Sequence, residues 1–282
     1  DTELAQSVQH MPPIDNSDVA LARRGIAMMQ KFMPPVDTSG VDIEDLMIPS
    51  FETDANHKIP VRTYRPSDAT ESLPVMLFFH WGGFMLGNLE TEHARCVMIA
   101  RAAGCLVVSV DYRLAPEHPY PAGAEDCYSA LLWVTKQAEL LDADITRLAV
   151  GGTSAGGGLA AALCLMSRDR GGPPIRFQFM GFPVTDHRMV TGSVKAFNNT
   201  PNWTYDATVN MWRFYLGENS AESISVYASP LIATDFSQLP SAYIWTAEFD
   251  PLLIHTTSGS WPFLAIQMGW LGVDKDGLCG HP

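Results

Sequence analysis

Short, uninterrupted runs of hydrophobic residues alternate with longer amphipathic segments through the middle of the chain. The hydrophobic runs have the length of buried strands and fall at residues 74–79, 105–110, 147–150, 175–182 and 242–247. Between them, the pattern predicts helices over residues 90–103, 122–139 and 155–168. Apolar strands that alternate with helices are typical of a mainly parallel sheet covered on both faces. The chain is therefore expected to have an α/β fold.

Two segments fall outside this alternation. Residues 1–45 have hydrophobic residues at roughly helical spacing, interrupted by two proline pairs, and predict two amphipathic helices. A pair of strands is expected next, at 43–52 and 58–65. Residues 185–235 interrupt the strand–helix alternation and are rich in aromatic residues. We expect the first segment and this insertion to form a small helical cap on the main domain, which spans residues 46–282, and ordinary packing is the alternative for both segments.

The most specific short motif follows the strand predicted at 147–150. Gly152, Ser154 and Gly156 form a G-x-S-x-G pattern that leads directly into a predicted helix. In this context the pattern predicts a sharp turn that raises the serine above the sheet, with glycines where side chains would clash. The first amides of the helix would face any negative charge that develops beside the serine. The alternative is a Gly-rich turn that binds a phosphate or no ligand.

Polar residues follow the ends of several predicted strands. His80, Asp111, Ser154 and Asp250 each lie just beyond such an end. Parallel sheets place their sites at the carboxyl ends of the strands. We therefore expect these four residues to gather at one edge of the sheet.

A second glycine-containing loop, His80-Trp81-Gly82-Gly83-Phe84, follows the strand predicted at 74–79. Small residues there can leave main-chain N–H groups free above the sheet. Together with the N–H of Ala155, they could surround a carbonyl oxygen as it becomes an oxyanion. The alternative is a tight turn, and for His80 we expect the structural role of bracing the loop.

The composition restricts the class of protein and its partners. With 46% hydrophobic and 17% charged residues, the chain can bury a sizeable core. The net charge of −13 argues against nucleic acid as a partner, because phosphate binding requires clustered basic residues. The five cysteines are scattered and lack metal-site spacing, so we expect reduced thiols, no metal and a cytoplasmic protein. No N-terminal stretch has the basic start and apolar run of a signal peptide, and no apolar run is long enough to span a bilayer. The sequence therefore predicts no membrane partner.

Several motifs occur together in a characteristic order. They are His80-Trp81-Gly82-Gly83, Asp111-Tyr112-Arg113-Leu114-Ala115-Pro116-Glu117, Tyr120-Pro121-Ala122, Gly152-Thr153-Ser154-Ala155-Gly156-Gly157 and Glu248-Phe249-Asp250-Pro251-Leu252. The chain from about residue 40 to 252 resembles the hormone-sensitive-lipase-like (bacterial family IV) carboxylesterases, especially the bacterial heroin-esterase and acetyl-esterase types. The resemblance implies an α/β-hydrolase fold, a cap and cofactor-free hydrolysis of short-chain or aryl esters.

The resemblance also implies roles for single residues. Ser154 would be the nucleophile, and Asp250 would orient the catalytic histidine. The amides of Gly82, Gly83 and Ala155 would form the oxyanion hole. These positions match the motifs of the family residue by residue.

The histidine is the position at which the chain departs from the family pattern. From about residue 253 the expected helix, strand and His-Gly loop are not recognisable, as in a truncated or frame-shifted end. His281 lies close to the expected spacing after Asp250 and keeps the order Ser…Asp…His, so it is the candidate base. The alternative for His281 is a terminal residue without a role.

The substrate pocket has four aromatic candidates. Trp81 stands where the family usually has the first of three glycines, and Phe84, Trp203 and Trp212 complete the set. For Trp203 and Trp212, core packing of the insertion is the alternative.

Three functions remain open at this stage. The first is a serine carboxylesterase acting on a small-molecule ester. The second is a non-hydrolytic small-molecule binder, either inactive or receptor-like, as in the plant gibberellin receptors of the same family. A lipase for long acyl chains is a weaker third. For the oligomeric state we carry a homodimer as the hypothesis.

Overall fold

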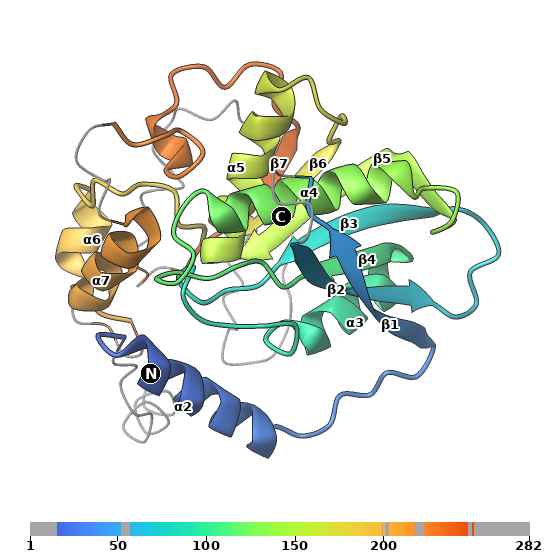
Figure 1. Ribbon diagram of the computed structural model, residues 1–282, viewed down its shortest axis with the longest axis horizontal. Helices are drawn as coiled ribbons and strands as arrows, with labels where there is room; N and C mark the ends of the chain where they lie inside the picture. Colours follow the sequence, from blue (N-terminus) through green and yellow to red (C-terminus); the bar gives the residue numbers. More distant parts are fainter. Residues whose placement is uncertain are drawn as a thin grey trace, which may run out of the picture.

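A seven-stranded sheet forms the centre of the computed structural model, which describes residues 16–51, 57–198, 200, 203–217, 223–247 and 250 (Figure 1). The strands lie in the order β1-β2-β4-β3-β5-β6-β7. Their bounds are β1 Val41–Pro49, β2 Lys58–Pro66, β3 Leu73–Phe79, β4 Leu106–Val110, β5 Ala143–Thr153, β6 Phe177–Gly181 and β7 Ser241–Trp245. The pairs β1–β2 and β2–β4 are antiparallel, and the other pairs are parallel. The predicted mainly parallel sheet is thus confirmed.

Helices cover both faces of this sheet (Figure 1). Successive residues of a strand point to opposite faces, so β3 contributes to two cores. Val75 and Leu77 pack in the cluster that includes α4 (Ala122–Lys136) and α5 (Ala155–Asp169). Phe78 packs in the second cluster, with α3 (His93–Ala103). Because these strands are buried on both faces, their sequences are continuously hydrophobic.

The other helices are α2 (Val19–Phe32), α6 (Gly192–Ala196), α7 (Tyr205–Leu216) and the short 3-10 helix η1 (Pro230–Ile232). They lie beside these layers, with α2, α6 and α7 at the left of Figure 1 and η1 in contact with α5. The side chains of Asp18 and Thr204 accept main-chain hydrogen bonds at the starts of α2 and α7. Asn16 joins these two helices, since its Nδ2 donates to the carbonyl oxygen of Ala207 at 2.8 Å. The first predicted helix of residues 1–45 lies largely outside the described residues.

Several predicted element ends differ from the structure. The helix predicted from residue 90 begins at His93, because the side chain of Asn88 accepts from the main-chain N–H of Glu90 and holds a turn instead. The helix predicted to end at residue 139 ends at Lys136, and residues 137–142 form turns. The strand predicted at 147–150 extends over Ala143–Thr153. Such ends depend on single hydrogen bonds that hydrophobic periodicity does not record.

Arg23 fixes α2 to the main body of the protein. Its Nε donates to the carbonyl oxygen of Met85 at 2.8 Å, and its Nη2 donates to the carbonyl oxygen of Ala115 at 2.9 Å. The guanidinium also forms two 2.8 Å hydrogen bonds with the carboxylate of Glu117. One side chain of α2 therefore contacts the loop after β3 and the loop after β4.

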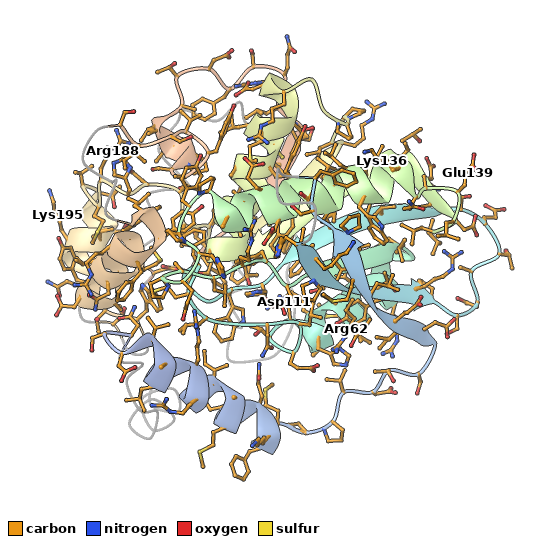
Figure 2. The ribbon with its side chains drawn as sticks, in the orientation of Figure 1. Arg62, Asp111, Lys136, Glu139, Arg188 and Lys195 are labelled. Atoms are coloured by element: carbon orange, nitrogen blue, oxygen red, sulfur yellow. The ribbon has the colours of Figure 1, made fainter. Side chains whose placement is uncertain are left out.

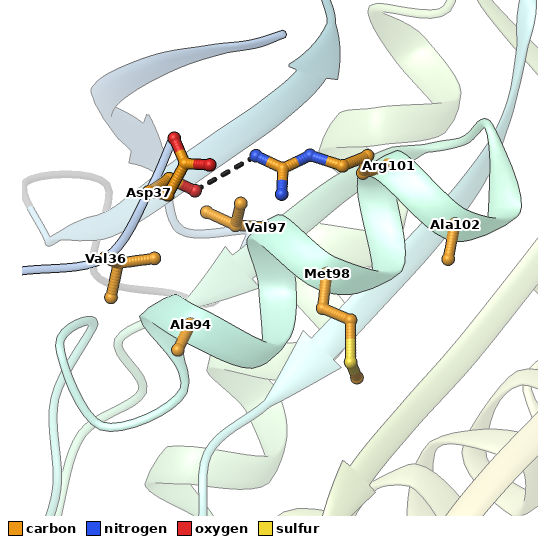
Figure 3. Close-up of a pocket in the computed structure, with 7 residues that line it drawn as sticks. All are labelled: Val36, Asp37, Ala94, Val97, Met98, Arg101 and Ala102. Carbon is orange, nitrogen blue, oxygen red and sulfur yellow. Dashed lines mark hydrogen bonds between the residues drawn. The ribbon is translucent and has the colours of Figure 1, made fainter. Parts of the chain in front are cut away.

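An apolar groove lies on the α3 side of the sheet (Figure 3). It is lined by Val36, Asp37, Ala94, Val97, Met98, Arg101 and Ala102. Arg101 Nη2 closes one side by donating to the carbonyl oxygen of Asp37 at 3.0 Å. Since α3 and α5 cover opposite faces of the sheet, this groove is separate from the turn that holds Ser154.

Within the described ranges, none of the helices has the length and apolar character that crossing a membrane requires. Nor do these ranges contain three or more His, Cys, Asp or Glu side chains placed to hold a metal ion.

Candidate active site

Ser154 occupies the turn between β5 and α5 in a strained conformation. Its φ of 53° and ψ of −118° cost of order 1–3 kcal/mol for a residue with a side chain. Main-chain hydrogen bonds hold it there: Ser154 N–H donates to the carbonyl oxygen of Gly181 at 2.8 Å. Its own carbonyl accepts from Gly158 at 3.0 Å and from Val184 at 3.1 Å. The predicted sharp strand–helix turn is present.

The two glycines of the motif permit α5 to lie against the end of β3. A Cβ on Gly156 would lie 2.0 Å from the carbonyl oxygen of Phe79, and a Cβ on Gly152 would lie 2.6 Å from the same oxygen. Both distances are far below van der Waals contact. The absence of side chains thus brings the serine turn next to the point where the loop after β3 begins.

Ser154 is more exposed to solvent than the residues around it in the sequence. All other residues from Val150 to Ser167 are buried, whereas Ser154 is partly exposed. It is also the residue that immediately precedes the first turn of α5, whose N-terminal amides carry partial positive charge.

The loop after β3 presents main-chain donors near this turn. Gly82 and Gly83 have φ values of 135° and 59°, which favour glycine. The carbonyl of Gly82 accepts from Met85 at 3.1 Å and from Leu86 at 2.9 Å, which closes the loop. Within the described part of the chain, the N–H groups of Gly82, Gly83 and Ala155 donate to no protein acceptor. Three free donors at the ends of adjacent strands form the arrangement that an oxyanion requires.

His80 braces the loop from below. It is fully buried, and its Nδ1 donates to the carbonyl oxygen of Trp81 at 2.8 Å. Its ring stacks on Tyr112 at 4.2 Å between centroids, and the Tyr112 hydroxyl donates to the His80 carbonyl at 2.8 Å. Burial lowers the pKa of His80 to about 4, so the ring is neutral near pH 7. These contacts match the structural role expected for His80.

Asp111 lies at the end of β4, beside His80 and Arg62 (Figure 2). Its Oδ1 is 3.9 Å from His80 Nε2. Burial raises the pKa of Asp111 to about 6, although the nearby Arg62 opposes this shift. Arg62 is itself paired with Asp45 at 2.5 Å and Glu90 at 2.8 Å. The ionised form of Asp111 is therefore disfavoured in the folded protein.

A buried carboxylate that sequence reasoning missed contacts the residue before the serine. Glu92 is 3% exposed, and its Oε1 accepts a short hydrogen bond from the hydroxyl of the fully buried Thr153. Its Oε2 accepts from Arg95 Nε at 2.7 Å. Thr153 lies inside the predicted motif, but nothing in the sequence pattern relates it to Glu92.

The aromatic candidates differ in their surroundings. Phe84 and Trp212 are 3% and 4% exposed, and Phe84 stacks on Tyr215 at 3.8 Å between centroids. They are members of the main core cluster. Trp203 is half-buried, and its Cη2 lies 2.9 Å from where a Cβ on Gly83 would be. Trp81 is also half-buried. Of the four, Trp203 is the side chain that the structure brings against a candidate oxyanion glycine.

Asp250, the candidate orienting carboxylate, is the last of the described residues, and His281, the candidate base, lies beyond them. Asp250 follows β7, and its N–H donates to the carbonyl oxygen of Ala247 at 3.2 Å. The four strand-end residues thus follow β3, β4, β5 and β7, at the carboxyl ends of parallel strands. His281 and the whole atypical segment from residue 253 lie outside the described residues.

The sheet, the strained serine between β5 and α5 and the free donors after β3 together define an α/β hydrolase. Residues 76–257 match the family model described as alpha/beta hydrolase fold. Esterase LipI of Mycobacterium tuberculosis is 41% identical over 196 residues, which cover 69% of this chain and 61% of LipI. Carboxylesterase NlhH of the same organism is 38% identical over 240 residues, which cover 84% of this chain and 73% of NlhH.

A solved structure of bacterial heroin esterase superposes with a TM-score of 0.86 at 39% identity, over 89% of this chain and 80% of that one. The chain belongs to the hormone-sensitive-lipase-like family IV of α/β hydrolases. The resemblance found in the motifs is thereby confirmed. The matched segment spans less than two thirds of the length of LipI.

Proposed function

We propose that this protein hydrolyses carboxylic esters of the short-chain or aryl type, with Ser154 as nucleophile. The observation that carries the proposal is the partly exposed, strained serine at the start of α5, next to three N–H groups that have no protein acceptor among the described residues. Ser154 Oγ attacks the ester carbonyl and loses its proton to a base, while Gly82, Gly83 and Ala155 stabilise the oxyanion. One such donor contributes about 2.7–4 kcal/mol to the transition state.

The intermediate collapses when the carbon–oxygen bond to the alcohol breaks, and the alcohol leaves with the proton from the base. Water then attacks the acyl-enzyme, gives its proton to the same base and releases the acid. We assign the base to His281, by its position after Asp250, and the orienting carboxylate to Asp250. No cofactor or metal enters these steps.

The relatives support this reaction over a non-hydrolytic function. LipI, NlhH and heroin esterase are all named as esterases, and each match covers more than two thirds of this chain. A receptor-like or inactive binder is therefore not favoured. The short-chain or aryl substrate class is the one that the family resemblance implies, and it is supported by the half-buried aromatic side chain of Trp203 beside Gly83.

Three further features belong to the same proposal. We place the cap in residues 1–45 and the insertion at 185–235, which is supported by the bond of Asn16 to α7. A cytoplasmic location is supported by the four free buried cysteines of the described chain, Cys96, Cys105, Cys127 and Cys164. A homodimer is proposed for the oligomeric state, and sedimentation velocity tests it.

A burst experiment with p-nitrophenyl acetate tests the reaction. We expect a burst of one p-nitrophenol per active site, followed by slower turnover, in the wild-type protein. Ser154→Ala should show neither phase, while its circular dichroism stays unchanged. Hydrolysis that persists in Ser154→Ala would exclude Ser154 as nucleophile, and a wild-type protein without hydrolysis would exclude the esterase. His281→Asn tests the base in the same assay.

A further inference from the structure

We propose that Glu92 is a positioning residue for the nucleophile: its buried carboxylate holds Thr153 and so fixes the strained turn at Ser154. The proposal rests on the function proposed above, because its kinetic consequence requires Ser154 to react. It concerns a residue outside all the motifs of the sequence.

The contacts of Glu92 leave little freedom to the carboxylate. One oxygen accepts from the Thr153 hydroxyl and the other from Arg95 Nε at 2.7 Å. The main-chain carbonyl of Glu92 accepts from the N–H of Cys96 at 2.8 Å, which anchors Glu92 at the start of α3. The partial positive charge at the start of a helix favours a carboxylate there. Glu92 is thus a buried carboxyl group with two side-chain donors, at the start of a helix.

Thr153 transmits this constraint to the serine. Its main chain pairs with Gly181 in the β5–β6 ladder, which fixes the residue on one side. The hydrogen bond to Glu92 fixes its side chain on α3, at a site 61 residues away along the chain. A strained conformation persists only where several surrounding contacts hold the residue in place. The bond to Glu92 is the side-chain contribution to that constraint, directly before the positive φ of Ser154.

The same bond joins the two halves of the candidate site. The loop of Gly82 and Gly83 continues through the turn at Asn88 into Glu92. Thr153 is the last residue of β5, and Ser154 follows it in the turn. Glu92 therefore connects the segment that carries the oxyanion donors to the segment that carries the nucleophile. Its loss should change the distance between them more than it changes the binding of the substrate.

Steady-state kinetics of three variants test this consequence. Thr153→Val removes the hydroxyl at nearly constant volume, Glu92→Gln removes the charge, and Thr153→Ser keeps the hydroxyl. Since a misplacement of about 1 Å can cost on the order of 100-fold, we expect kcat to fall roughly 10- to 100-fold in the first two. KM should change by less than about 3-fold, and Thr153→Ser should stay near wild type.

Thr63→Val is the matched control, because Thr63 is a buried strand threonine in β2, away from the serine turn. It should leave kcat unchanged. If Thr153→Val and Glu92→Gln keep kcat within 2-fold of wild type, or if Thr153→Ser loses as much as Thr153→Val, the proposal is wrong.

Amide hydrogen exchange measures the same constraint without any need for activity. The N–H groups of Ser154, Gly158 and Val184 form the hydrogen bonds that hold the turn. We expect these amides to exchange at least 10-fold faster in Thr153→Val and Glu92→Gln than in Thr63→Val. The double variant should exchange no faster than Thr153→Val, because both substitutions act on the same hydrogen bond, which Thr153→Val removes and Glu92→Gln weakens.

The two experiments separate the proposal from the function on which it rests. If wild-type protein hydrolyses no ester while exchange at the turn responds as expected, the esterase fails and the positioning by Glu92 stands. If exchange at the turn equals that of the control, the positioning fails whatever the activity. Where Glu92→Gln does not fold, the comparison of Thr153→Val with Thr153→Ser decides the outcome.

Discussion

Adding one methyl group at Gly156 tests whether the close approach of α5 to β3 positions the nucleophile. A Cβ there would lie 2.0 Å from the carbonyl oxygen of Phe79 and 2.7 Å from that of His80. Both are main-chain atoms, so rotation of a side chain cannot relieve the contact. The first turn of α5, together with Ser154, must move away from the loop after β3 by about 1 Å to restore van der Waals contact.

The cost can be worked from two opposing terms. Overpacking of a rigid contact destabilises a protein by about 1–3 kcal/mol. Alanine in place of glycine within a helix returns about 0.5–1 kcal/mol. Gly156→Ala should therefore lower the free energy of unfolding by an amount within about 0–2.5 kcal/mol, with a midpoint of about 1 kcal/mol. Because the serine moves relative to the oxyanion donors, kcat/KM should fall on the order of 100-fold.

Urea unfolding followed by fluorescence measures the first effect, and hydrolysis of p-nitrophenyl acetate measures the second. Gly25→Ala in α2 is the matched control, since no heavy atom of the described chain lies within 4 Å of a Cβ at that position. The control should gain about 0.5–1 kcal/mol and keep its activity. A Gly156→Ala protein with wild-type stability and wild-type kcat/KM would refute the reasoning.

Three other substitutions have calculable outcomes. Burial raises the pKa of Asp111 from its ordinary value of 3.8 to about 6, so the folded state loses stability as pH rises through this range. Asp111→Asn should therefore be more stable than wild type at pH 7 by about 1–3 kcal/mol and equal to it below pH 3.8, and a pH-independent difference in urea unfolding would contradict this. Trp203→Ala opens space beside Gly83, so the ratio of kcat/KM for p-nitrophenyl octanoate over acetate should rise about 10-fold, and an unchanged ratio in a folded variant would remove Trp203 from the pocket. Arg23→Lys should cost about 1–3 kcal/mol in urea unfolding, against less than about 0.5 kcal/mol for the exposed Arg24→Lys, and equal losses would show that the contacts of Arg23 do not stabilise α2.

The fold was predictable because its strands are buried on both faces. Val75–Phe79 alternates between two hydrophobic clusters, so every position is apolar and the strand stands out in the sequence. The ends of elements were less predictable. The start of α3 depends on the side chain of Asn88, and the full length of β5 depends on pairing with β3 from Leu73 onward. These are contacts that periodicity does not contain.

The candidate site shows the same division. The requirement for Gly152 and Gly156 was predictable because a turn and its close packing are local properties of the motif. The contact between Glu92 and Thr153 was not, since it arises only when folding brings the residue before α3 next to the last residue of β5. The motif likewise marks where Phe84 lies, but its burial against α7 follows from packing of the insertion.

The contacts of Arg23 have a consequence for how the protein tolerates mutation. Two of its acceptors, at Met85 and Ala115, are main-chain carbonyls, which no side-chain replacement deletes. Substitutions at Met85 and Ala115 can therefore alter local packing while their main-chain hydrogen bonds to Arg23 are kept. Among the contacts of Arg23, a codon change at Arg23 removes the whole set, and one at Glu117 removes the two bonds to its carboxylate. A library that randomises the side chains at Met85 and Ala115 therefore leaves both main-chain acceptors of Arg23 in place.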